Sequence, residues 1–194
     1  MREYYFSRNS DELRRVRVVQ AAVLADPSLA GLEAVLLETR DLSQLGYKVL
    51  SRLGFDSAEP RWQAQGQAAQ WVIDGLRPAQ EYPLGRDGSY VNTFAATDED
   101  ASEGRLVSPE FEIKGDMISL KVGGGQSPAT ERIQLVIGNQ PVRTATGCDT
   151  DWMGQRVWNV SQYKGQRAHY VIEDTGTGSW GHLVVDDIVE WQAP

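Results

Sequence analysis

From residue 62 onward, the chain consists of short apolar segments separated by glycine-rich turns. About ten such segments can be counted, and apolar residues alternate with polar ones in several of them. This pattern is typical of antiparallel β-sandwiches and jelly rolls. We therefore predict a mainly β fold, an antiparallel β-sandwich of the jelly-roll type, over residues 62–194. The predicted strands are residues 62–66, 70–73, 90–94, 111–113, 117–122, 133–137, 141–145, 156–160, 168–172 and 183–191.

Glycines and tryptophans inside this pattern have structural explanations. The Gly138-Asn139-Gln140 segment fits a hairpin connection between two predicted strands. The run Gly123-Gly124-Gly125 lacks the Lys-Ser/Thr pair of a phosphate-binding loop. We interpret it as a bulge or a close approach of two backbones, where a side chain would not fit. Four tryptophans lie in strand patterns and are predicted to be core residues: Trp62, Trp71, Trp158 and Trp191.

Residues 1–61 differ in composition from the rest of the chain. They hold none of the six tryptophans and only three of the 19 glycines. Their apolar residues recur at helical spacing after Ser10, after Ser28 and after Asp41, which predicts three short helices. The third helix is expected to carry Leu42, Leu45, Val49 and Leu53 and to end at Gly54. The sequence thus predicts a helical segment over residues 1–61 before the β-sandwich module over residues 62–194.

Charge and cysteine content exclude several function classes. The net charge of −8 argues against a nucleic-acid partner, because phosphate contacts need clustered lysines and arginines. No apolar run approaches the roughly 20 residues that span a bilayer, so no membrane insertion is expected. Cys148 is the only cysteine, which excludes an internal disulfide and predicts an inert thiol. With two histidines and one cysteine, a zinc site is not expected either, and we predict no cofactor.

Seven motifs occur in an order and spacing that resemble a known kind of module. They are YVNTF (90–94), LVSPEF (106–111), VGGG (122–125), VRTATG (142–147), VWNVSQYKG (157–165), IED (172–174) and WGHLVVD (180–186). Together they resemble a galactose-binding-like jelly-roll module found beside the catalytic domains of levanase and β-fructosidase-type glycosidases. A similar module occurs in bacterial envelope proteins that carry c-type cytochrome domains. The resemblance covers residues 62–194, and the family has aspartate where this chain has Asn159.

The resemblance implies a non-catalytic, carbohydrate-binding-like accessory module of a longer exported or envelope protein. Its location would then be extracellular, periplasmic or in the cell envelope, and its partners would be a carbohydrate and the other domains of the longer chain. The first eight residues do not resemble a signal peptide, so a cytoplasmic location stays open. A purely structural domain that docks against other domains is the first alternative.

Trp180 and His182 form the leading candidate ligand-binding pair. A sugar presents an apolar face and a polar rim, which an aromatic ring and a few fixed hydrogen-bonding groups can match. The glycines at 178 and 181 would allow an exposed conformation of this segment. The alternative is that both residues belong to the core. Secondary candidates for ligand contact are Tyr90, Asn92, Arg143, Asp174 and Asp186.

Two other chemistries use acidic residues. A glycoside hydrolase needs two carboxyls flanking the sugar bond, and Asp174 with Asp186 is the best pair for that second alternative. No Gly-x-Ser-x-Gly motif of a serine hydrolase is present. The acidic loop that contains Asp98 and Asp100 offers weak candidates for a structural calcium ion. We interpret this loop as solvated and expect no metal centre.

Overall fold

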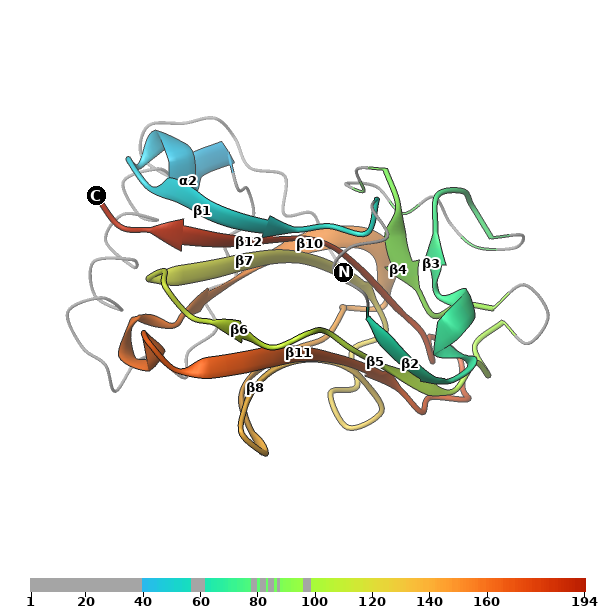
Figure 1. Cartoon of the computed structure of the whole chain (residues 1–194). Helices are drawn as coiled ribbons and strands as arrows, with labels where there is room; N and C mark the ends of the chain where they lie inside the picture. Colours follow the sequence, from blue (N-terminus) through green and yellow to red (C-terminus); the bar gives the residue numbers. More distant parts are fainter. Residues whose placement is uncertain are drawn as a thin grey trace.

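The protein is described by a computed structural model that covers residues 40–56, 62–77, 80, 83, 86, 88–95 and 99–194. Within these residues, two antiparallel six-stranded sheets lie face to face (Figure 1). This confirms the mainly β prediction. The elements are α2 (Arg40–Gln44), β1 (Lys48–Leu53), β2 (Gln63–Gly66), the 3-10 turn η2 (Gln67–Gln70), β3 (Val72–Ile73), β4 (Tyr90–Asn92), β5 (Gly104–Val107), β6 (Phe111–Glu112), β7 (Met117–Gly124), β8 (Glu131–Ile137), β9 (Gln140–Ala145), β10 (Thr150–Asn159), the 3-10 turn η3 (Ser161–Tyr163), β11 (Arg167–Asp174) and β12 (Leu183–Gln192).

Each sheet is organised around one long C-terminal strand. In the first sheet the order is β10-β7-β12-β4-β3, and β1 pairs with β12 beyond the end of β4. In the second sheet the order is β2-β5-β11-β8-β9, and β6 pairs with β11 beyond the end of β5. Short strands therefore share one edge of β12 and one edge of β11. This arrangement leaves β1 and β6 on the same open side of the sandwich (Figure 1).

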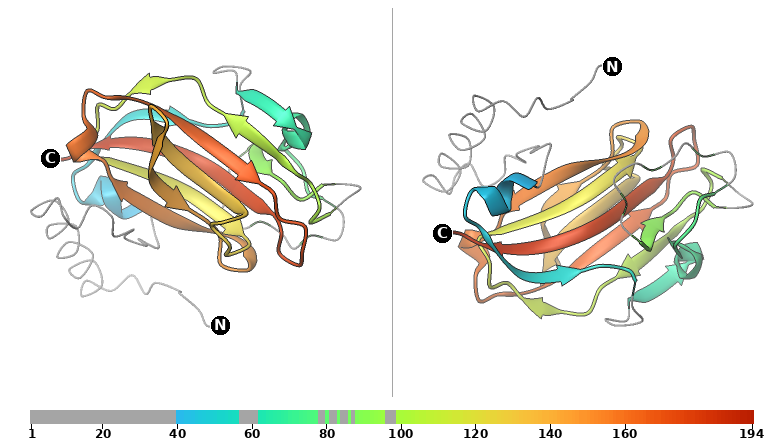
Figure 2. Two further views of the ribbon diagram at one scale, coloured as in Figure 1. Left: turned by 90° about the horizontal axis from the view of Figure 1, so that it is seen from below. Right: turned by 90° about the horizontal axis from the view of Figure 1, so that it is seen from above.

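The core lies between the sheets and continues onto the outer face of the first sheet. Trp71 and Trp158 are 1% exposed and belong to the main core. Trp191 lies in a second cluster with Leu42 of α2, which sits beside the end of β12 (Figure 2). Trp62 is half-buried and packs against the main core. The prediction that these four tryptophans are core residues is confirmed, with Trp62 at its margin.

The predicted third helix is wrong beyond its first turn. α2 ends at Gln44, and residues Lys48–Leu53 form β1, which pairs antiparallel with β12. Gly46 adopts a φ of +87°, where an L side chain is strained, and this turn closes the helix. The remaining apolar spacing fits a helix, but hydrogen bonding to the free edge of β12 overrides such local preference. The two helices predicted before residue 40 lie outside the described residues.

The strand predictions hold for most of residues 62–194. All ten predicted segments contain or overlap a strand, and the Gly138-Asn139 hairpin joins β8 to β9. Gly138 has a φ of +59°, as such a turn requires. The predictions missed β5, whose four residues carry only Leu106 as a buried apolar side chain.

The glycine run at the end of β7 is a close approach of backbones, as predicted. Gly124 has a φ of +92°, and a Cβ at this position would lie 2.2 Å from the carbonyl oxygen of His182. A Cβ on Gly125 would lie 2.0 Å from the carbonyl oxygen of Trp180. The Gly125 amide also donates a hydrogen bond to the His182 carbonyl at 2.8 Å. The run therefore lets the segment before β12 lie directly on β7.

We expect Gly124→Ala to destabilise the fold by about 2 kcal/mol more than Gly138→Ala, because the new methyl group meets fixed backbone. Gly138 is a matched control: its φ is also positive, but a Cβ there meets nothing within 4 Å. Both variants thus share the left-handed backbone strain and differ in the clash. Urea unfolding of the two variants measures the difference. Equal losses of stability would mean that the segment before β12 moves aside freely.

Candidate functional site

His182 is the centre of a cluster where the segment before β12 meets the loop around Asp100 and the start of β10. Its side chain is buried just before β12; Nδ1 lies 2.5 Å from Asp100 Oδ1 and Nε2 lies 2.8 Å from Asp151 Oδ1. Burial lowers the pKa of His182, but the hydrogen bonds and charges of Asp151 and Asp100 outweigh it, so the pKa is raised above its usual value. As an imidazolium, the ring donates from both nitrogens and ties the two aspartates together.

Two aromatic rings pack on this imidazole. Trp180 stacks on it with ring centroids 5.6 Å apart and planes at 29°, and Phe94 meets it edge-on at 5.1 Å. Trp180 is only partly buried and has a φ of +63°, an unusual and strained backbone for a bulky side chain. A hydrogen bond from the Gly181 amide to the Gly178 carbonyl at 2.8 Å closes the turn around it. We call His182, Asp100, Asp151, Trp180 and Phe94 the histidine cluster.

The cluster continues inward as a buried polar network. Asp151 accepts a second hydrogen bond from Gln80 Nε2 at 2.8 Å. The Asn92 amide donates to Gln80 Oε1 at 2.6 Å and to the Tyr90 hydroxyl at 3.3 Å. Tyr90 in turn donates to the Gly75 carbonyl at 2.9 Å. The structure thus brings the predicted residues Tyr90 and Asn92 together with His182, but both are completely buried and bond to protein groups.

Asp174 lies at the end of β11, next to this network. Its carboxylate accepts hydrogen bonds from the Thr93 hydroxyl and from the Gly176 amide at 2.9 Å. Burial raises its pKa to about 7, with the charge of Glu131 in the same direction, although these hydrogen bonds lower it. A pKa near 7 suits a general acid. The side chain, however, is fully buried, so a substrate has no path to it.

Arg143 and Asp186 lie apart from the histidine cluster. The Arg143 guanidinium donates to the Asn159 carbonyl at 2.5 Å and lies over the Tyr163 ring. Asn159 pairs with Met117, at the opposite end of β7 from Gly124. Asp186 is 2% exposed within β12 and accepts a hydrogen bond from the next amide.

Neither carboxyl of the predicted glycosidase pair, Asp174 and Asp186, faces solvent, and the two belong to different sheets. A sugar bond flanked by both would require a rearrangement of the sandwich.

The predicted calcium loop is described only in part. Asp98 lies outside the described residues, and Asp100 bonds to His182. Among the residues that the structure describes, no group of three or more histidine, cysteine or acidic side chains could hold a metal ion. Within the same ranges, no helix is long and apolar enough to cross a membrane.

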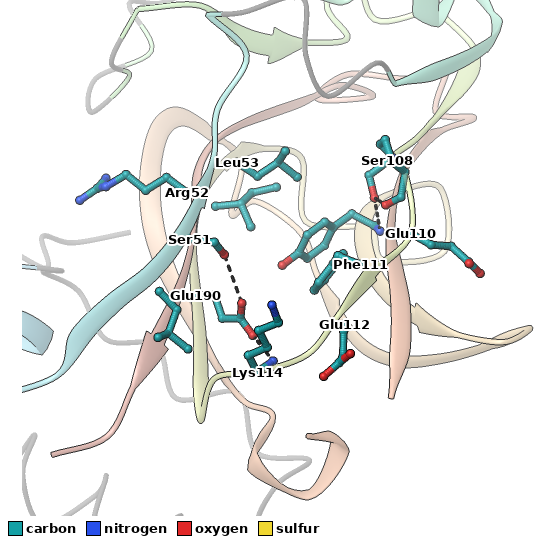
Figure 3. Close-up of a pocket in the computed structure, with 13 residues that line it drawn as sticks. Ser51, Arg52, Leu53, Ser108, Glu110, Phe111, Glu112, Lys114 and Glu190 are labelled. Carbon is teal, nitrogen blue, oxygen red and sulfur yellow. Dashed lines mark hydrogen bonds between the residues drawn. The ribbon is translucent and has the colours of Figure 1, made fainter. Parts of the chain in front are cut away.

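A cleft of about 420 Å³ opens between β1 of one sheet and β6 of the other (Figure 3). The Phe111 and Tyr170 rings stack in it at 4.9 Å and 21°. Glu190 accepts hydrogen bonds from the amides of Lys114 and Gly115 at 2.6 and 2.7 Å, and from the Ser51 hydroxyl at 3.1 Å. We call this space the edge cleft. Its lining residues are Leu50, Ser51, Arg52, Leu53, Ser108, Pro109, Glu110, Phe111, Glu112, Lys114, Tyr170, Ile188 and Glu190.

The sequence does not predict Asp151 in the histidine cluster or Glu190 and Phe111 in the edge cleft. The local signal for Asp151 is a carboxylate next to a tryptophan, although that tryptophan, Trp152, is 48% exposed and lies outside the cluster. Glu190 and Phe111 gave no local signal, because their role depends on strands distant in the sequence.

Comparisons with known proteins give one sequence relative. No family model matches the chain. A protein of Aspergillus rugulosus, provisionally named the glycosyl hydrolase ecdE, is 36% identical over 117 residues. The match covers 60% of this chain and 16% of the relative, so the chain spans about one sixth of that protein's length.

Solved structures of similar shape are more distant. The K3 cleaved adhesin domain of Lys-gingipain from Porphyromonas gingivalis W83 is 13% identical, with a TM-score of 0.48, covering 73% of this chain and 98% of that one. A family 35 carbohydrate-binding module from Clostridium thermocellum is 9% identical, with a TM-score of 0.36, covering 72% and 96%. At these scores the likenesses say nothing about ligand or activity.

Proposed function

We propose that this chain is a non-catalytic carbohydrate-binding accessory module of a larger exported or envelope protein. The observation that carries the proposal is the geometry of Trp180. Its indole is partly exposed, its backbone is strained, and the buried His182 supports the ring. Strained residues concentrate at functional sites, and a fixed aromatic ring can stack on the apolar face of a sugar.

Four of the other predicted residues support this turn rather than contact the ligand. His182, Asn92 and Tyr90 hold the turn around Trp180 through the buried network, and Asp174 anchors the adjacent strand end. A match to one sixth of a protein named as a glycosyl hydrolase is compatible with an accessory role beside a catalytic part. The resemblance to modules of fructan-cleaving enzymes makes levan and inulin the first glycans to test.

A docking role between domains is the second candidate. The edge strand β1 exposes Val49 and Leu50 by 44% and 45%. Exposed apolar side chains on a strand edge are a common feature of protein contacts. This role needs no sugar, so glycan binding separates the two candidates.

We expect wild-type protein to bind a neutral polysaccharide on a glycan array and in pull-downs with levan and inulin, and Trp180→Ala to weaken that binding about tenfold or more. Trp152→Ala is the matched control, because it removes a tryptophan that is also exposed but does not pack on His182. Thermal unfolding checks that both variants fold. Binding by wild type that survives Trp180→Ala contradicts the assignment of the site, and no binding to any glycan favours the docking role.

A further inference from the structure

We propose that the edge cleft is a second ligand site, which takes a neutral glycosyl unit; this rests on the proposed carbohydrate-binding function. The cleft is separate from Trp180. Leu183, at the start of β12, follows directly after His182 of the histidine cluster. Glu190 lies seven residues further along the same strand, a distance of roughly 20 Å in an extended chain. A volume of about 420 Å³ lies within the range of small-molecule sites, roughly 300–1,000 Å³.

The apolar part of the cleft is an aromatic surface. Phe111 from β6 is partly exposed and stacks on the buried Tyr170 of β11. Because Tyr170 fixes the orientation of the Phe111 ring, the Phe111 side chain loses little conformational entropy when a ligand binds to its exposed surface. Ile188 continues the apolar lining on the opposite sheet. A flat ring with an apolar face, such as a pyranose or furanose, matches this surface.

The polar part of the cleft is a fixed hydrogen-bonding pair. The backbone amides of Lys114 and Gly115 donate to one oxygen of Glu190. The Ser51 hydroxyl donates to the other oxygen (Figure 3). The second oxygen keeps a lone pair, and the Ser51 oxygen is itself an acceptor. Vicinal sugar hydroxyls could donate to these two atoms. The aromatic surface and the acceptor pair come from opposite sheets, so a ligand between them contacts both.

Charge in and around the cleft favours a neutral ligand. Arg52 bonds to Asp187 at 2.7 Å, and Glu110 pairs with Arg167 at 3.0 Å, so these rim charges are compensated by groups outside the lining. The other charged residues of the lining are two carboxylates, Glu112 and Glu190, and one lysine, Lys114. The chain as a whole carries −8, which repels acidic polysaccharides.

A peptide added to the edge strand is the less suitable occupant. The pairing of β1 with β12 shifts register between Val49 and Ser51, which leaves Leu50 as a bulge. A bulge twists an edge and interrupts the regular row of amides and carbonyls that an added strand needs. Lys48 and Arg52 flank the bulge, and charged side chains also discourage strand addition.

The test is an NMR titration of isotopically labelled protein with short neutral oligosaccharides from levan, inulin, xylan and cellulose. We expect shifts of the Ser51 and Glu112 amides in wild type, retained in Trp180→Ala. Phe111→Leu, which keeps an apolar side chain without the ring, should weaken binding at the cleft about tenfold. Leu76→Ala is the control, because it truncates a 53% exposed side chain outside the cleft.

The outcomes separate the two proposals. Oligosaccharide binding that perturbs only residues around Trp180, with no response at Ser51 or Glu112, overturns the cleft site and leaves the proposed function standing. No binding of any oligosaccharide overturns both. Because the wild-type shifts locate the ligand without any substitution, the result does not depend on whether Phe111→Leu folds. Shifts along β1 caused by an apolar peptide but by no sugar would identify a docking edge instead.

Discussion

Replacing His182 with alanine is expected to lower the free energy of unfolding by about 3 kcal/mol. The substitution leaves Asp151, which is 2% exposed, with Gln80 as its remaining side-chain partner. A buried carboxylate without its cationic partner is costly, because the protein cannot replace the lost solvation. Trp180 and Phe94 also lose the ring on which they pack. Urea unfolding at pH 6 measures the effect.

Two further variants show whether this loss of stability comes from the buried charge of Asp151 or from the packing of the imidazole ring. His169→Ala removes the only other histidine, which is half-buried on β11, and should change stability by no more than about 0.5 kcal/mol. Adding Asp151→Asn to His182→Ala removes the stranded charge and should restore about 1–2 kcal/mol. A double variant as unstable as His182→Ala would show that ring packing, and not the buried charge, dominates the loss.

The loss should also depend on pH. The folded protein raises the pKa of His182 above its ordinary value of 6.5, so the protonated ring contributes stability. That contribution is complete below about pH 6.5 and disappears as the pH rises through the folded pKa. The difference between wild type and His182→Ala should therefore be larger at pH 6 than at pH 9. A constant difference would mean that His182 binds its proton no more tightly in the folded protein than in the unfolded chain.

The sheet strands were predictable because the alternation of apolar residues is a local property. β1 was not, since the spacing of Leu42, Leu45, Val49 and Leu53 fits a helix equally well in isolation. Its pairing partner β12 lies more than 130 residues away, and only the folded sheet supplies that edge. Local pattern therefore identified the strands of the sandwich and failed where a distant strand decided the structure.

The candidate site shows the same limit. Trp180 and His182 could be paired from the sequence, because they are two residues apart. Asp151 and Asp100 lie 31 and 82 residues from His182, and no spacing predicts such contacts. Tyr90 and Asn92 were predicted as ligand contacts because they are polar groups at a strand end. The structure buries them instead, and their hydrogen-bonding groups bond to one another and to Gln80.

Wild-type protein should lose stability as the pH rises from 4 to 7, and Asp174→Asn should lose less. Burial raises the pKa of Asp174 from 3.8 to about 7, so between these values the folded state binds a proton that the unfolded state has released. The contribution of Asp174 to stability therefore falls with rising pH in this window and levels off above it. A shift of this size corresponds to about 4 kcal/mol at most. Unfolding by urea at pH 4.5, 6 and 8 measures the slope.

Asparagine tests the charge while conserving the shape. Its oxygen can still accept from the Gly176 amide, but its NH₂ group faces Thr93, whose hydroxyl then lacks an acceptor. That mismatch costs about 1 kcal/mol at every pH, so it shifts the curve without changing its slope. Asp149→Asn, at a partly exposed aspartate, controls for the loss of one negative charge. If Asp174→Asn runs parallel to wild type, Asp174 ionises in the folded protein as easily as in the unfolded chain. The hydrogen bonds from Thr93 and Gly176 would then fully offset its burial.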